Sequence, residues 1–210
     1  MASRKRERDA RLVKSRSGPW ASASQDYMRL CHMLYQQSCA YAKAHDGNVS
    51  PYPLAGVPLL FSALRALLIE CNSGMFGKAL AGNASLHRLC NDANELPLLR
   101  EQYRFTNEHL PLLYEVRNEI VHPAHRPVGT ENNTPPYIVP LREFGVLQSR
   151  GEGSESDYGW SAQLQSHKLF RWACEQVAHA AACVIDAHHS DVEFAELHKT
   201  TCFRFRQLDA

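Results

Sequence analysis

One short segment of this chain gathers side chains that could do chemistry. It runs from Arg117 to His122, reads Arg-Asn-Glu-Ile-Val-His, and is followed by Pro123. An imidazole can take up and release a proton near neutral pH, and a guanidinium can stabilise the negative charge that develops on a phosphate. Because a protein can cleave RNA with these groups and no metal ion, the segment is the first candidate for a functional site.

The same segment has a simpler interpretation as the end of a helix. A proline disfavours α-helical geometry in the residue before it, so the helix should end at His122. There the helix dipole would favour a histidine cation that only faces solvent. A second arginine and histidine at similar spacing, Arg104 and His109, lack an asparagine directly after the arginine, and we expect them to lie at the surface.

Length and amino-acid composition limit the classes of protein to which this chain can belong. The chain has 210 residues, of which 44% are hydrophobic and 21% charged, which suits one core with extensions. We find no apolar run of transmembrane length and no signal peptide. The seven cysteines form no C-x-x-C pair, and the eleven histidines form no H-E-x-x-H motif. We therefore expect reduced thiols in a cytoplasmic protein, with neither a metal ion nor a cofactor.

Charge is distributed unevenly along the chain. The formal net charge is +1, but residues 1–18 carry seven Lys and Arg against two acidic residues, a net of +5. Such a segment is typical of a disordered, solvated arm, and it can also attract nucleic acid without sequence preference. We assign residues 1–21 to this arm, 22–189 to a helical domain and 190–210 to a C-terminal extension.

Hydrophobic periodicity predicts four substantial helices, and hence an all-α bundle. The first covers about 25–44, and the second begins at Pro53 or Pro58 and continues to about Cys71. The second is the most apolar, so it should form the centre of the core. The third region covers about 95–122, where Pro111 either kinks one helix or lies in the first turn of a new one. The fourth covers about 161–188.

The remaining segments have weaker patterns. A short helix is expected around 86–91, and 123–160 is a proline- and glycine-rich insertion between the third and fourth helices. Within this insertion, 137–139 and 144–147 could pair as a small β-hairpin, and 151–159 resembles a loop. Residues 201–206 alternate like a strand, although a frayed tail fits equally well.

A helical projection of the third helix, at roughly 100° per residue, predicts where the reactive groups point. Asn118 and His122 fall on the face opposite the core arc, which is formed by Leu110, Leu113, Val116, Ile120 and Val121. Arg117 falls inside the apolar arc, where an unpaired charge would be costly, so it should reach the rim or pair with an acid. Glu70 is the candidate partner. Because a fully exposed imidazole contributes little to catalysis, a second subunit is expected to cover this face.

With these residues identified, the chain resembles a HEPN domain. The resemblance rests on Arg117-Asn118-x-x-x-His122 before Pro123, and on the order of the helices, with Glu70 near the end of the second. It covers about residues 22–189. It implies an up-and-down four-helix bundle that forms a homodimer and cleaves RNA without a metal, and many such proteins are toxins or antiviral effectors.

The resemblance also implies roles for the site residues. His122 would transfer protons, Arg117 would stabilise the phosphate and the transition state, and Asn118 would be the polar positioning residue. In the implied reaction, a ribose 2′-hydroxyl attacks the adjacent phosphate. His125 could extend the site or merely belong to a loop. One branch of the family is paired with a nucleotidyltransferase antitoxin and carries a tyrosine where this chain has Ala124, so that regulation is not expected. The alternative is a non-catalytic, dimeric nucleotide-binding, RNA-binding or scaffold module.

Overall fold

The structure of this chain, a computed structural model, describes residues 23–45, 48–75, 109–122, 135–147 and 160–187. Most of these residues are helical and none of them lies in a strand, so the described part is of the all-α class. One isolated antiparallel bridge joins Val49 to Ser166. The helices are α2 (Ala23–Ala44), α3 (Pro53–Met75), α6 (His109–Val121), α7 (Ile138–Glu143), α8 (Trp160–Gln163) and α9 (His167–Ala187).

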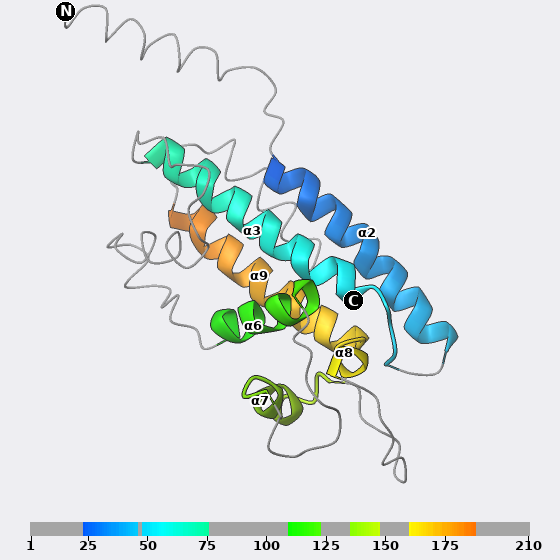
Figure 1. The fold of residues 1–210 in the computed structure, drawn as a ribbon. Coiled ribbons are helices and arrows are strands. Elements are labelled where there is room, and N and C mark those ends of the chain that lie inside the picture. Colours follow the sequence, from blue (N-terminus) through cyan, green and yellow to red (C-terminus); the bar gives the residue numbers. More distant parts are fainter. Residues whose placement is uncertain (1–22, 46–47, 76–108, 123–134, 148–159, 188–210) are drawn as a thin grey trace, which may run out of the picture.

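Helix α3 is at the centre of this arrangement. It packs against α2, α6 and α9, while α2 and α6 each also contact α9. In Figure 1, α2 and α3 run in opposite directions, α9 lies along the other side of α3, and the shorter α6 lies against α9. The prediction that the second helix forms the centre of the core is therefore confirmed.

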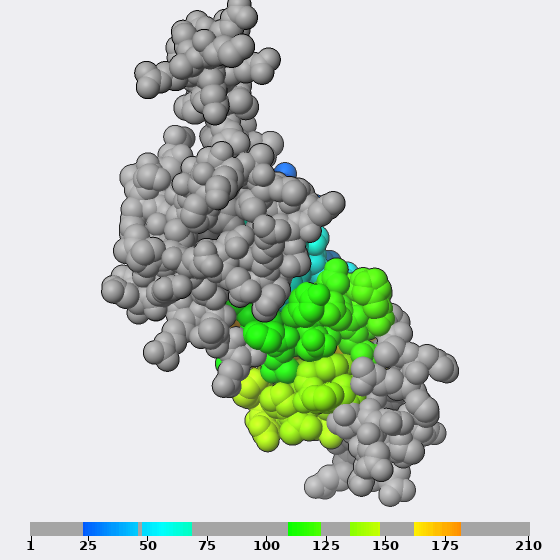
Figure 2. Space-filling model, turned by 60° about the vertical axis from the view of Figure 1, so that its left-hand side comes forward, coloured from blue at the N-terminus to red at the C-terminus, as the bar shows by residue number. Residues whose placement is uncertain are grey.

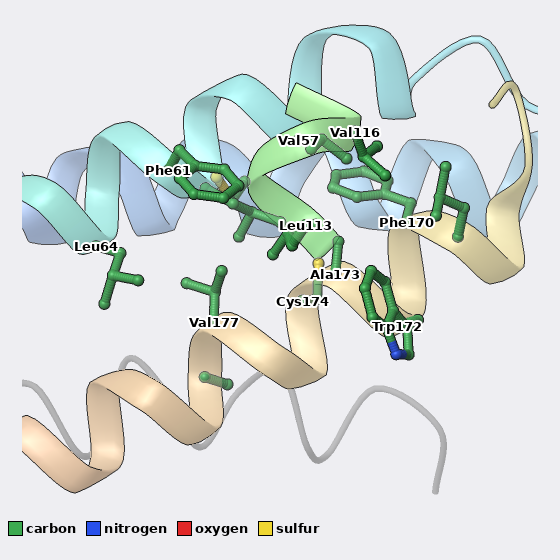
Figure 3. Close-up of a cluster of buried hydrophobic side chains, with 14 of the residues drawn as sticks. Val57, Phe61, Leu64, Leu113, Val116, Phe170, Trp172, Ala173, Cys174 and Val177 are labelled. Carbon is green, nitrogen blue, oxygen red and sulfur yellow. The ribbon is translucent and has the colours of Figure 1, made fainter. Parts of the chain in front are cut away.

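The core is built from one face of each of these helices. In Figure 3, Phe61 of α3, Leu113 and Val116 of α6, and Val177 of α9 converge on one cluster. Leu113 and Val116 are fully buried, which fixes the rotation of α6 about its axis. Among the described side chains of α3, the most buried are Val57, Leu60, Ala63, Leu64, Leu67 and Leu68.

A glycine lets α3 approach α9 closely. A Cβ atom at position 56 would overlap the ring of Phe170. Phe170 is fully buried and makes an edge-to-face contact with Tyr35 of α2, with ring centroids 5.8 Å apart. The absence of a side chain at position 56 therefore makes room for the ring that joins α2, α3 and α9.

The positions of the prolines relative to the helices can now be compared with the predictions. Helix α3 begins at Pro53, and Pro58 lies inside it. Helix α6 begins at His109, so Pro111 is in its first turn, where the missing N–H is not needed. Of the two possibilities predicted for Pro111, the start of a new helix is the one observed.

The predicted β-hairpin is wrong for the described residues, because 138–143 form helix α7. Ile138 and Leu141 are both fully buried, a three-residue spacing that suits a helix face and not a strand face. Gly145 ends the segment with φ of 65°, and its N–H donates to the carbonyl of Arg142. A left-handed glycine after a helix satisfies its last carbonyl groups, and this outweighs the β propensity of the Ile-Val pair.

The last long helix begins later than predicted. Residues 160–163 form the separate short helix α8, and α9 starts at His167. Ser166 precedes α9, and its Oγ accepts a hydrogen bond from the N–H of Leu169 at 3.2 Å. This is the contact of a helix N-cap. The pattern of apolar residues continues across the break, so periodicity alone did not indicate it.

Among the described residues, none of the helices has both the length and the apolar character that a membrane crossing requires. Several predictions lie outside the described residues, namely the basic arm, the short helix at 86–91, the loop at 151–159 and the strand at 201–206.

Candidate functional site at the end of helix α6

The candidate residues lie in the last turns of α6. Arg117 and Asn118 are half-buried, whereas His122 is exposed directly beyond the end of the helix. The N–H of His122 donates to the carbonyl of Asn118 at 2.7 Å, so the backbone continues its helical hydrogen bonding up to the histidine. Asn118 and His122 therefore lie one helical turn apart, and His122 lies outside the core.

The side chains of Arg117 and Asn118 contact each other. Nη1 of Arg117 donates a hydrogen bond to Oδ1 of Asn118 at 3.0 Å. The half-buried guanidinium of Arg117 thus has an amide of its own helix as a partner. Sequence reasoning missed this partner because adjacent helical residues do not normally face each other. The asparagine directly after the arginine was the only available signal.

The structure does not describe the side chains of the two supporting residues predicted from sequence. Glu70 belongs to α3, but its side chain is not among those described. His125 lies outside the described residues. The structure thus joins the side chains of Arg117 and Asn118 and places His122 one turn after Asn118, while the pairing of Arg117 with Glu70 stays a prediction.

The surroundings of the site combine polar and apolar surface. Val121, expected in the core arc, is 38% exposed, whereas Leu113 and Val116 of the same helix are fully buried. Ile120 is partly buried against the core. Figure 2 shows α6 at the molecular surface, next to the segment 135–147. An exposed apolar residue therefore directly precedes the exposed His122 in the chain.

His109 is the described member of the second arginine–histidine pair, and it has a role in packing. His109 is the first residue of α6 and is half-buried, so the expectation of a surface residue is wrong for it. Its Nδ1 is 3.0 Å from Oε1 of Gln176 on α9. Its ring also packs against Phe144 and Trp172, with centroid distances of 5.0 and 5.8 Å. His109 thus anchors the start of α6 to α9.

No group of three or more His, Cys, Asp or Glu side chains within the described ranges is placed to hold a metal ion. The chain matches no protein-family model, no curated protein and no solved structure.

Proposed function

We propose that this chain is a metal-independent endoribonuclease of the HEPN type, whose helices form an up-and-down four-helix bundle. The observation that carries the proposal is the hydrogen bond between Arg117 and Asn118, with His122 one turn further along the same helix. A cation, an amide and an imidazole thereby lie within the last turns of α6 and the residue after it. Such a set can bind a phosphate and move a proton next to it.

The proposed reaction is attack of a ribose 2′-hydroxyl on the adjacent phosphate of an RNA strand. The imidazole of His122 transfers a proton during this step, because an imidazole is the side-chain group best suited to general acid–base catalysis near neutral pH. The guanidinium of Arg117 contacts the phosphate oxygens and stabilises the charge of the transition state. The products are a 2′,3′-cyclic phosphate and a 5′-hydroxyl.

The amide of Asn118 has a positioning role in this proposal. Its Oδ1 holds one nitrogen of the Arg117 guanidinium, which limits the directions that the planar group can take. A fixed guanidinium loses less conformational entropy when it binds a phosphate than a freely rotating one does. Asn118 thus acts through Arg117 and need not touch the reacting atoms.

A single protomer supplies only part of such a site. His122 is exposed, and water competes with any interaction it makes. We infer that a second copy of the chain covers this end of α6 and brings its own Arg117 and His122, forming a homodimer with a shared cleft. The exposed Val121 beside His122 supports an interface at this place, because apolar surface is favourable to bury.

The resemblance further suggests a biological setting. HEPN ribonucleases of this kind are often toxins or antiviral effectors, so the expected partners are RNA and an antitoxin or other regulator encoded elsewhere. The basic segment at residues 1–18 would add sequence-independent attraction to RNA.

The proposal is tested by incubating the purified chain with total RNA in excess EDTA and following fragment formation. Wild type should cleave, and His122→Ala should lose on the order of a hundredfold or more. His45→Ala is the matched control, because His45 is also exposed but lies at the end of α2. Cleavage that EDTA abolishes and magnesium restores would contradict the proposal. RNA binding without cleavage by wild type would favour the non-catalytic binding module instead.

A further inference from the structure

A polar cluster lies where the end of α2 meets the start of α9. It comprises Ser38 and Cys39 of α2, Ser50 of the following loop and His167 of α9, and we call it the His167 cluster. Nδ1 of His167 is 2.9 Å from Oγ of Ser38, and Nε2 of His167 is 3.5 Å from Sγ of Cys39. Oγ of Ser38 is in turn 2.6 Å from Oγ of Ser50. A thiol, an imidazole and two hydroxyls therefore form one hydrogen-bonded chain.

The imidazole is held firmly in this position. The N–H of His167 donates to the carbonyl of Asn48 at 2.7 Å, and its ring packs against Tyr35 with centroids 5.3 Å apart. Asn48 also accepts from the N–H of Lys168 through Oδ1 and donates through Nδ2 to Oγ of Ser166, at 2.8 and 2.7 Å. The orientation of the ring toward Cys39 is thus determined by contacts on its backbone, its face and its Nδ1.

The pattern of donors in the cluster suits a base that acts on the thiol. When Nδ1–H of His167 donates to Ser38, the hydroxyl of Ser38 donates onward to Ser50, and Nε2 is left with a lone pair toward Cys39. Nε2 can then take the proton of the Cys39 thiol, giving an imidazolium beside a thiolate. A nucleophile, a base and a third group that orients the base are the three parts of an activated nucleophile.

From this geometry we propose that Cys39 is a reactive thiol, activated by His167, and a site of modification by small disulfides. The Cys39 thiolate attacks one sulfur of the disulfide, a new S–S bond forms, and the original S–S bond breaks. The departing thiolate takes up the proton that Cys39 gave to His167. Cys39 is oxidised to a mixed disulfide, and the other half of the reagent leaves as the reduced thiol.

Other described cysteines provide internal controls for this proposal. Cys31 and Cys174 are buried thiols, whereas Cys39 is partly exposed. Burial raises the pKa of the Cys31 thiol to about 12, so it stays protonated under ordinary conditions. Cys39 lies two helical turns from Cys31 on α2, and the structural difference between them is exposure and contact with His167.

The test is cysteine labelling of the folded, full-length protein by iodoacetamide, with each cysteine quantified by peptide mass spectrometry. At about pH 7, Cys39 should react far faster than Cys31 and Cys174. His167→Gln should slow the labelling of Cys39 by roughly tenfold, because an ordinary thiol is only a few per cent ionised there. His45→Gln, which removes an exposed imidazole at the end of the same helix, should leave the rate unchanged.

The dependence of the labelling rate on pH distinguishes activation of the Cys39 thiol from a change in its accessibility. In wild type, the labelling rate of Cys39 should reach its plateau well below the pH at which an ordinary thiol ionises, and at alkaline pH wild type and His167→Gln should converge. Oxidised glutathione should form a mixed disulfide at Cys39 ahead of Cys31 and Cys174. A wild-type profile that follows an ordinary thiol, with an inflection at about pH 8.5, would overturn the proposal even if His167→Gln failed to fold.

Discussion

Nη1 of Arg117 and Oδ1 of Asn118 are joined by a 3.0 Å hydrogen bond between neighbours on one helix. This contact gives the guanidinium a polar partner, although the position of Arg117 in the helical projection lies within the apolar arc. An arginine at that position is compatible with folding because its long side chain can cover apolar surface while its charged end reaches the rim. The pair thus links the packing of α6 to the chemistry proposed for its end.

Replacing Arg117 by lysine should lower RNA cleavage strongly while leaving the fold intact. A lysine ammonium keeps the charge but lacks the planar fork that contacts two phosphate oxygens. We expect turnover to fall by roughly tenfold or more, in line with the loss of one stabilising contact in the transition state. Arg171→Lys is the matched control, since Arg171 forms an exposed ion pair with Glu175 on α9. Unchanged cleavage by Arg117→Lys, with circular dichroism like that of wild type, would show that Arg117 is structural only.

If each site takes residues from two subunits, adding an inactive subunit should lower RNA cleavage by more than the dilution of the wild-type chain alone. We would co-assemble wild type with an Arg117→Ala/His122→Ala subunit at several ratios and measure RNA cleavage. Because each cleft needs groups from both chains, activity should fall faster than the fraction of wild-type chain. A monomer at low concentration that cleaves RNA with full activity per chain would contradict the shared site.

Ser166→Ala should destabilise the domain. Oγ of Ser166 accepts hydrogen bonds from the N–H of Leu169 and from Nδ2 of Asn48, and it donates to the carbonyl of Val146. Removing it leaves buried groups without partners at the start of α9, which costs about 2 kcal/mol or more in the free energy of unfolding. Ser62→Ala, the same change at an exposed position of α3, should have little effect. Urea denaturation compares the two, and equal midpoints would refute the capping role.

Gly56→Ala should also destabilise the domain, by a different mechanism. The new methyl group would overlap the ring of Phe170, and overpacking of this kind costs about 1–3 kcal/mol. Adding Phe170→Leu to Gly56→Ala should recover part of the loss, because the smaller side chain gives the methyl group room. A double-mutant cycle measured by denaturation gives the coupling energy. Strictly additive effects would mean that the ring and position 56 do not contact each other.

The parts of the fold that sequence predicted best are those where one helix supplies a continuous apolar face. Helix α2 was predicted within two residues at its start and to the residue at its end, and the burial of α3 follows from its run of leucines. Helix α7 was mistaken for part of a hairpin because Ile and Val favour strands locally. The burial of Ile138 and Leu141 together, which depends on the rest of the fold, decides in favour of a helix.

The candidate site could be found from sequence only in part. The spacing of Asn118 and His122 placed them one turn apart, and the projection placed His122 away from the core. The hydrogen bond from Arg117 to Asn118 depends on how two adjacent side chains bend toward each other, which residue spacing does not encode. The His167 cluster joins residues 128 and 129 positions apart, and a single sequence gives no signal of that proximity.

The central claim is that His122 assists attack by the ribose 2′-hydroxyl, and the most direct measurement uses a pair of matched RNA substrates in EDTA. One is a short RNA that wild type cleaves, and the other carries a single 2′-deoxy nucleotide at the cleavage position. We predict that wild type cuts only the first, leaving a 2′,3′-cyclic phosphate and a 5′-hydroxyl, and that His122→Ala cuts neither at a comparable rate. Cleavage of the 2′-deoxy substrate at the same position, or fragments with a 5′-phosphate and a 3′-hydroxyl, would contradict the proposed mechanism.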